Sequence, residues 1–152
     1  MPTSEIDTDR VVATLNGILE LELAGVVRYT HYSLMIFGHA RIPVTGWMRE
    51  QALEGHAHAV QAGEHVTSLG GHPSLKIGKL LETERHGMDD ILRESIEHER
   101  RGLALYRQLL EQVAGRHVTL EDYARSMIVE EEAHVSEMEK MLRQPGSLEP
   151  AS

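Results

Sequence analysis

The sequence predicts an all-α fold, a single domain built as a four-helix bundle. Glycine and proline residues divide its 152 residues into four long segments, and this length is typical of one domain. In three of the segments, apolar residues recur at spacings of three and four, the pattern of a helix that buries one face. No segment shows the apolar–polar alternation of a strand.

The first two segments predict long helices joined by a short loop. We expect the first helix over residues 8–37, ending before the glycine and proline of residues 38–43. The second is expected to begin after Thr45, a residue type that often caps helix N-termini, and to end at the glycines and proline of residues 70–73. Because the loop is short, these helices should be antiparallel neighbours.

The last two segments predict a second antiparallel pair. We expect the third helix over residues 87–114, with Gly115 as its stop. Thr119 and Asp122 resemble a capping box, so the fourth helix should begin there and end near Arg143.

Residues 71–86 link the second predicted helix to the third. At about 3.3 Å per residue the link could extend about 50 Å, enough to run the length of the bundle and make these two helices parallel. The alternative is a short extra helix over residues 75–81. The bundle then covers about residues 8–143 of one domain spanning 1–152, followed by a short disordered C-terminal tail with no fifth helix.

Composition excludes several classes of function. Acidic residues outnumber basic ones by 24 to 15, a formal net charge of −9, which argues against a nucleic-acid partner because phosphate binding needs clustered lysine and arginine. The absence of cysteine excludes disulfides, thiolate zinc sites and iron–sulfur clusters. Since neither a long apolar stretch nor a signal peptide is visible, we expect a cytoplasmic protein that does not enter a membrane.

Charged residues interrupt three apolar rows at positions where leucine is expected. Glu22 lies in the row of the first helix, Glu99 in that of the third, and Glu131 with His134 in that of the fourth. A buried carboxylate without a partner is so costly that it takes up a proton, pairs with a cation or binds a metal ion. Because none of these rows contains lysine or arginine, a metal site is favoured over residues at the rim of the bundle.

The second helix contributes a matching pair, although its faces are less clearly separated in polarity. Glu54 and His58 are four residues apart and share a face, as Glu131 and His134 do at a spacing of three. One glutamate on each of two helices, with a Glu–His pair on each of the other two, is the arrangement of di-iron carboxylate bundles. Two divalent cations would balance the four glutamates, and imidazole with carboxylate suits iron, manganese or zinc.

Two tyrosines are expected beside this site. Tyr29 and Tyr106 follow Glu22 and Glu99 by seven residues, two helical turns further along the same face. Their phenol groups could donate hydrogen bonds to the site carboxylates. Other acidic and histidine side chains are expected to be solvated or in loops: Glu130, Glu132, His31, His39, His65, His72, His86, His98 and His117.

Taken together, these motifs resemble those of the bacterioferritins, within the ferritin-like di-iron carboxylate superfamily. The resemblance covers about residues 11–143. It rests on three motifs: residues 15–23 followed by Tyr29, residues 91–93 followed by Glu99, and residues 130–134. It implies a ferroxidase that holds two iron ions per chain and oxidises Fe(II) with oxygen or hydrogen peroxide for iron storage or detoxification. It also implies a homo-oligomer, at least a dimer and up to a shell. The implied iron ligands, which are also the catalytic residues, are Glu22, Glu54, His58, Glu99, Glu131 and His134, with Glu54 and Glu131 bridging.

The chain departs from the bacterioferritin pattern at three places. The family's Glu-x-x-His motif on the second helix would place a glutamate at Gly55, whereas Glu54 stands one position earlier, so the helix is locally rotated or this ligand is weakened. His56 occupies the position of the haem-binding methionine, so methionine-ligated haem is not expected and His56 itself is the candidate haem ligand. The family's fifth helix, which lines a symmetry axis of its shell, has no counterpart after Arg143.

Three other functions remain as alternatives. The first is a rubrerythrin-like protein that scavenges peroxide at the same di-iron site without storing a mineral, although a chain without cysteine cannot hold that family's cysteine-ligated iron. The second is a DNA-protecting mini-ferritin, disfavoured because its iron site lies between subunits and because this chain has no basic tail. The third is a metal-free helical adaptor, which would leave three buried carboxylates unexplained.

Overall fold

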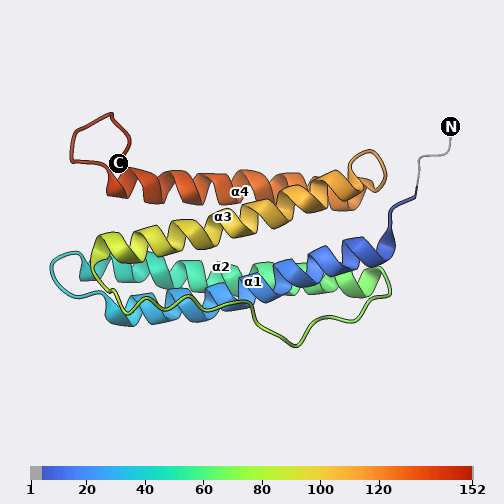
Figure 1. Cartoon of the computed structure of the whole chain (residues 1–152), viewed down its shortest axis with the longest axis horizontal. Coiled ribbons are helices and arrows are strands. Elements are labelled where there is room, and N and C mark those ends of the chain that lie inside the picture. Colours follow the sequence, from blue (N-terminus) through green and yellow to red (C-terminus); the bar gives the residue numbers. More distant parts are fainter. Residues whose placement is uncertain (1–4, 152) are drawn as a thin grey trace.

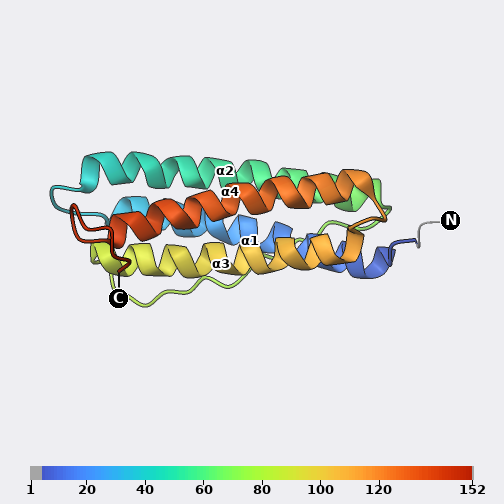
Figure 2. The same ribbon diagram turned by 90° about the horizontal axis from the view of Figure 1, so that it is seen from above.

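The chain forms four long helices, which confirms the predicted all-α four-helix bundle. The computed structural model describes residues 5–151, and no β-strand occurs among them. The helices are α1 (Thr8–Met35), α2 (Arg41–Ser68), α3 (Met88–Val113) and α4 (Val118–Leu142). The α1–α2 and α3–α4 pairs are each antiparallel and lie side by side, so that α2 runs parallel to α3 (Figure 1, Figure 2). Within the described part of the chain, no helix is both long enough and apolar enough to cross a membrane.

The first helix pair begins with recognisable signals, but α2 starts earlier than expected. Asp7 caps α1 by accepting a hydrogen bond from the backbone N–H of Arg10 at 3.2 Å. The prediction that α2 begins after Thr45 is wrong, because the helix already starts at Arg41 and Thr45 is buried within it. Pro43 lies in the first turn, where a backbone N–H would have no helical partner, so the helix tolerates it.

The second pair agrees closely with its predicted bounds, but a different residue caps α4. The ends of α3 differ from the prediction by one residue each. His117 caps α4, because its ring Nδ1 accepts a hydrogen bond from the backbone N–H of Leu120 at 3.2 Å. The predicted capping box at Thr119 is therefore wrong, since that residue is already inside the helix. Residues 143–151, which follow α4, contain no helix.

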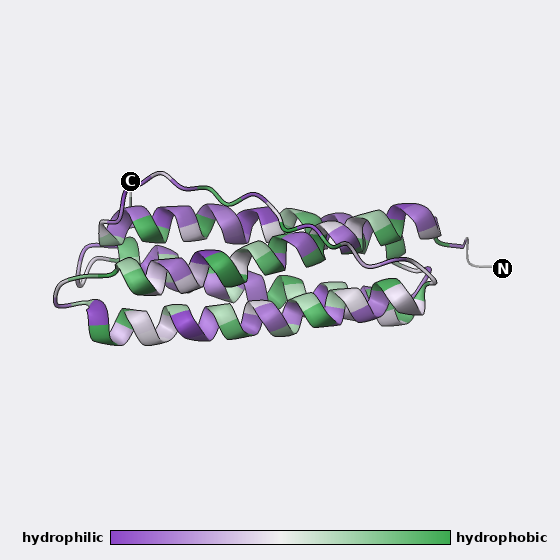
Figure 3. Cartoon of the chain, turned by 90° about the horizontal axis from the view of Figure 1, so that it is seen from below, coloured by the Kyte–Doolittle hydropathy of each residue, from purple (hydrophilic) through white to green (hydrophobic). Residues whose placement is uncertain are grey.

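An extended crossover connects α2 to α3 and lies along α1 (Figure 1, Figure 3). Residues 71–86 contain no helix, so the long crossover is the one of the two predicted forms that is observed. Near its start, the side-chain amide of Asn16 donates to the carbonyl oxygen of His72 at 3.1 Å. Further along, the N–H of Gly78 donates to the carbonyl oxygen of Glu20 at 2.8 Å. A β-carbon at Gly78 would lie 3.1 Å from that oxygen, so glycine permits this close approach to α1.

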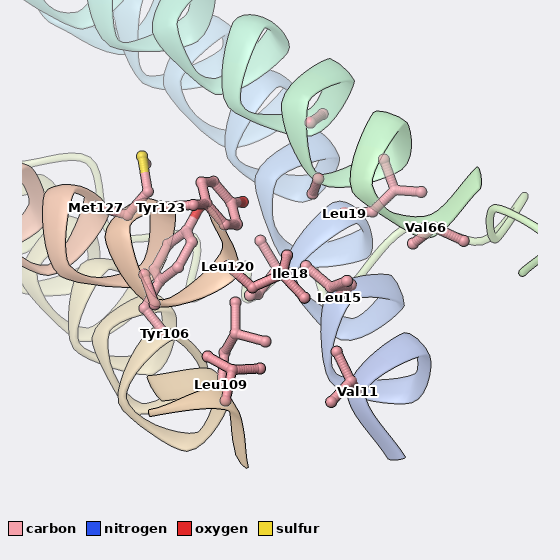
Figure 4. Close-up of a cluster of buried hydrophobic side chains, with 14 residues drawn as sticks. Val11, Leu15, Ile18, Leu19, Val66, Tyr106, Leu109, Leu120, Tyr123 and Met127 are labelled. Atoms are coloured by element: carbon pink, nitrogen blue, oxygen red, sulfur yellow. The ribbon is translucent and has the colours of Figure 1, made fainter. Parts of the chain in front are cut away.

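A layer of charged side chains divides the apolar core into two clusters. On α1, Glu22 lies between Ile18 of the first cluster and Tyr29 of the second. Figure 4 shows the first cluster, which comprises Val11, Leu15, Ile18, Leu19, Ala59, Ala62, Val66, Tyr106, Leu109, Val113, Leu120, Tyr123, Ala124 and Met127. The second comprises Tyr29, Tyr32, Ile36, Val44, Met48, Ala52, Ile91, Leu92, Ile96, Leu103, Val135 and Met138. Packed apolar side chains therefore enclose the charged layer from both ends of the bundle.

Candidate metal centre

The charged layer brings together side chains from all four helices. Glu22 of α1, His58 of α2, Glu99 of α3 and Glu131 of α4 are all buried. Each occupies a position on the face that its helix turns towards the middle of the bundle, the face that elsewhere carries leucine, isoleucine or valine. Four of the six predicted ligands are thus inside the bundle, and the other two, described below, lie at the rim of the same layer.

His58 lies among carboxylates from two other helices. Its Nδ1 is 3.4 Å from Glu22 Oε2 and 3.6 Å from Glu131 Oε1, and its Nε2 is 3.2 Å from Glu130 Oε1. Glu22, His58 and Glu131 each offer a ligand atom, and these three atoms lie within 4.8 Å of one another. This group is one place where a metal ion could bind.

His134 repeats this arrangement on the other side of Glu131. Its Nδ1 is 3.8 Å from Glu131 Oε2, and its Nε2 is 3.2 Å from Glu54 Oε2. Glu99, Glu131 and His134 form a second group with ligand atoms within 4.8 Å, and Glu54, Glu130 and His134 form a third. Because Glu131 belongs to the first two groups, its two carboxylate oxygens could bridge a pair of metal ions.

The two predicted tyrosines hold the carboxylates of α3 and α1. The hydroxyl of Tyr29 donates to Glu99 Oε1 at 2.5 Å, and the hydroxyl of Tyr106 donates to Glu22 Oε1 at 3.1 Å. In each case one carboxylate oxygen is held by the phenol and the Oε2 atom is left for another partner. The tyrosines therefore orient the carboxylates within the layer.

Burial controls the proton affinities of the layer. Burial raises the pKa of Glu22, and burial together with the hydrogen bond and charge of Glu131 raises the pKa of Glu99 well above its usual range. Burial also raises the pKa of Glu131, to about 7, against the lowering effect of its hydrogen bond with Glu99. Burial by itself lowers the pKa of His58, but the hydrogen bond and charge of Glu22 outweigh it and raise this pKa to about 9. The metal-free layer therefore retains protons near neutral pH, which binding of a cation would displace.

The donor atoms of the layer fit divalent transition-metal ions. Glu131 is only 2% exposed, yet its Oε2 makes no hydrogen bond. A buried carboxylate oxygen in this state is costly unless a cation satisfies it. A cavity of about 10 Å³ lies among these side chains. Oxygen and imidazole donors without sulfur suit iron, manganese or zinc.

The structure gives a reason for glycine at position 55, where the Glu-x-x-His motif would place a glutamate. Gly55 is buried against α1, where a β-carbon would lie 3.3 Å from the carbonyl oxygen of Glu22 and 3.4 Å from Cγ2 of Val26. Glycine at this position thus permits close packing of α1 against α2. Glu54, one position earlier, has a side chain that is 43% exposed and groups with His134 of α4.

The expectation that Glu130 faces water is only partly correct. Its side chain is 42% exposed, and its Oε1 contacts Nε2 of His58. Both histidines of the layer therefore turn Nδ1 inward to Glu131 and Nε2 outward to a half-exposed glutamate, Glu130 for His58 and Glu54 for His134. The sequence offered one signal for this role, because Glu130 adjoins the row glutamate Glu131.

The expectation that His98 is solvated is wrong. His98 is buried beside the cavity, with its ring centroid 5.8 Å from that of Tyr29. Burial, together with the positive charges of Arg28 and Arg101, lowers its pKa to about 3, so the ring is neutral. Gly25 provides the space, since a β-carbon there would lie 2.8 Å from Nε2 of His98. Sequence reasoning also missed Gln51, a buried side chain that lines the cavity.

The candidate haem ligand lies outside the charged layer. His56 is exposed on α2, and haem binding there stays a prediction. His39 and His72 are exposed as expected. His65 instead packs against Tyr123, with ring centroids 4.4 Å apart.

Comparisons with known proteins agree with this architecture. The family model described as ferritin, ferritin-like domain, matches residues 12–145. A ferritin-like, diiron-carboxylate protein from Bacillus anthracis str. Ames is similar in structure, with a TM-score of 0.86 and 22% identity over 90% of this chain and 98% of that one. A dodecameric thioferritin, the bacterioferritin-related protein from Bacteroides fragilis, has a TM-score of 0.85 and 23% identity over 91% and 87% of the two chains. Rhodobacter capsulatus bacterioferritin, with a metal-free dinuclear site and haem iron, has a TM-score of 0.75 and 24% identity over 90% and 85%. At these identities the likeness concerns the fold, and no curated protein sequence matched the chain.

Proposed function

The chain belongs to the ferritin-like domain family, and from this premise we propose that it is a ferroxidase with two iron positions in its charged layer. The observation that carries the proposal is the position of Glu131. This carboxylate is buried between two histidines, with one oxygen 3.6 Å from Nδ1 of His58 and the other 3.8 Å from Nδ1 of His134. A carboxylate between two nitrogen donors fits a pair of metal ions, as in the di-iron carboxylate bundles.

Two groups of residues supply the proposed iron positions. Glu22, His58 and Glu131 form one, and Glu99, Glu131 and His134 form the other. Of the six predicted ligands these groups include five, all except Glu54. Each histidine would bind through Nδ1, because its Nε2 faces a glutamate that can accept the Nε2–H and hold the ring in place.

Glu54, the sixth predicted ligand, lies with Glu130 at the rim of the layer. Both carboxylates are roughly half exposed, and with His134 they form the third group of convergent ligand atoms. Fe(II) arriving from solvent would meet these carboxylates before the buried ones, so we assign them to the entry of iron as well as to holding the histidines.

The proposed reaction uses Fe(II) as its substrate. Oxidation of two Fe(II) ions releases two electrons, which with two protons reduce oxygen to hydrogen peroxide or hydrogen peroxide to two water molecules. The protein's part is to hold carboxylate oxygens that stabilise the Fe(III) product. Glu22 and Glu99, whose pKa values burial raises, would release protons from their carboxyl groups when iron binds. Tyr29 and Tyr106 would keep these carboxylates oriented.

The similar structures support a wider proposal. They are a diiron-carboxylate protein, a dodecameric thioferritin, and a bacterioferritin with a dinuclear site and haem iron. We propose that this chain likewise forms a homo-oligomer, at least a dimer and up to a shell, that acts in the cytoplasm and uses the oxidation for iron storage or detoxification. Haem bound at His56 would show in the absorption spectrum of the purified protein.

Anaerobic titration with Fe(II), followed by addition of oxygen or peroxide, tests the proposal. We expect saturation near two iron ions per chain and then rapid oxidation, read by absorbance on protein whose native mass is known. Glu99→Ala should lose the oxidation while remaining folded, whereas Glu137→Ala, an exposed position on α4, should behave as wild type. Wild-type oxidation by Glu99→Ala, or binding of no iron, would refute the proposal. Uptake that stops at two ions with fast peroxide consumption would favour the rubrerythrin-like alternative over storage.

A further inference from the structure

A second cluster of metal-binding side chains lies on the outside of the bundle, where the crossover meets two helices. His31 belongs to α1, Glu82 to the crossover, and His86 to the last residues before α3. His31 Nε2 is 2.9 Å from Glu82 Oε2, and His86 Nε2 is 3.5 Å from Glu82 Oε1. One ligand atom from each residue lies within 4.8 Å of the others.

The two imidazole nitrogens are shielded although their rings are partly exposed. The side chain of His31 is 42% exposed and that of His86 is 27% exposed, yet both Nε2 atoms are buried and make no hydrogen bond. The ring centroids are 5.6 Å apart, and both Nε2 atoms face the Glu82 carboxylate. Two shielded nitrogens that converge on one carboxylate form a donor set that a bound cation would satisfy.

The separations suit a tetrahedral metal site. Zinc binds imidazole nitrogen and carboxylate oxygen at about 2.1 Å, which places neighbouring ligand atoms of a tetrahedron about 3.4 Å apart. The two nitrogen–oxygen separations, 2.9 and 3.5 Å, lie on either side of this value. Two histidines and one glutamate leave the fourth position for water or another ligand.

Contacts to the rest of the fold hold Glu82 in place. The backbone N–H of Glu84, a residue with φ of 57°, donates to Glu82 Oε1. The hydroxyl of Thr83 donates to Glu94 Oε2 at 2.7 Å, and Glu94 is buried and also accepts a hydrogen bond from Tyr32 at 3.1 Å. The crossover therefore presents Glu82 to the two histidines from a segment anchored on α3 and α1.

We propose that His31, Glu82 and His86 bind a divalent transition-metal ion, of the class of Zn²⁺ or Fe(II), at a site separate from the charged layer. His31 follows Glu22 of that layer by nine residues, about 14 Å along the axis of α1. Imidazole donors favour transition metals over Mg²⁺ or Ca²⁺. Because His31 belongs to α1 whereas Glu82 and His86 belong to the crossover, the bound ion ties the crossover to the bundle.

The proposal is tested by calorimetric titration of the full-length protein with Zn²⁺. This ion also fits the charged layer, and it does not change oxidation state. We expect His31→Ala/His86→Ala to bind one zinc ion fewer per chain than wild type, and Glu82→Gln to weaken that binding step at least tenfold. The matched control is His39→Ala/His72→Ala, which removes two exposed histidines outside the cluster and should leave the titration unchanged. Far-UV circular dichroism checks that each variant is folded.

Hydrogen exchange supplies an independent measurement of the same site. Zn²⁺ should slow the exchange of backbone amides in residues 78–88 of wild type and of the control, but not of His31→Ala/His86→Ala. An unchanged zinc count in His31→Ala/His86→Ala would overturn the proposal. So would equal protection of these amides in wild type and the double variant.

Discussion

Replacing Glu131 by glutamine should remove a defined part of the pH dependence of stability of the metal-free protein. Burial raises the pKa of this carboxyl from its ordinary value of 4.5 to about 7 in the folded state. Between these pH values the folded protein keeps a proton that the unfolded chain releases. The stabilisation from this group is therefore fully present below pH 4.5 and is lost as the pH rises to about 7.

The expected magnitude follows from the two pKa values. A difference of this size corresponds to about 3 kcal/mol of unfolding free energy lost across that pH window. Glutamine keeps the shape of the side chain but carries no proton to lose, so the variant should be more stable than wild type at pH 7. For a chain of this length, 3 kcal/mol corresponds to a rise in Tm of roughly 10 °C.

Urea unfolding of chelator-treated protein, followed by circular dichroism from pH 4 to 9, measures the effect. A fall in stability between pH 6.5 and 9 should remain in the variant, because His58, whose pKa is raised to about 9, stabilises the fold only while it keeps its proton. Glu137→Gln is the control, since Glu137 is exposed on the same helix. If Glu131→Gln kept the wild-type slope between pH 4.5 and 7, the pKa of Glu131 would not be raised in the folded protein, and the reasoning would be refuted.

Three further predictions concern residues at and beside the layer. Glu130→Ala should weaken metal binding by roughly 10- to 100-fold, because its carboxylate contacts Nε2 of His58, a proposed ligand. Glu132→Ala, at an exposed position two residues further on, should leave metal binding unchanged. Equal affinities of the two variants in a zinc titration would contradict this. His56→Leu should oxidise Fe(II) at nearly the wild-type rate, since this side chain is exposed on α2 outside the layer; a large loss in stopped-flow absorbance would show that α2 is registered differently. Gly25→Ala should destabilise the fold by about 1–3 kcal/mol in urea unfolding, because the new β-carbon would lie 2.8 Å from Nε2 of His98. The additional change His98→Ala should recover part of that loss, and an unchanged cost in the double variant would refute the proposed clash.

The charged layer reduces the stability of the metal-free bundle. Glu22, Glu99 and Glu131 are each less than a tenth exposed and lie between two apolar clusters, where a leucine would pack without desolvation cost. A bound metal ion would replace the protons that these carboxyl groups retain. Because the ion binds the folded protein and not the unfolded chain, its binding would stabilise the fold. This exchange gives a physical reason for a sequence to keep three carboxylates in a core.

Local patterns were sufficient for the helices and for most of the layer. The spacing of apolar residues along α1, α3 and α4 predicts which face is buried, because helical geometry repeats every 3.6 residues whatever lies opposite. Glu22, Glu99 and Glu131 stood out against those rows, and the tyrosines two turns later were predicted from the same geometry. The helix starts were predicted less well, since tertiary packing buried Thr45 inside α2 instead of leaving it at a terminus.

The sequence by itself thus determined the helices, their order and the residues that interrupt the buried faces. Only the tertiary structure decided which side chains from different segments meet. On α2, where apolar and polar faces are poorly separated, it grouped Glu54 with His134 and His58 with Glu130. The crossover likewise brought Glu82 to His31, across a separation in sequence that no helical period spans. The physical reason is that periodicity acts within one helix, whereas these contacts depend on how closely glycines such as Gly55 and Gly78 let neighbouring segments approach.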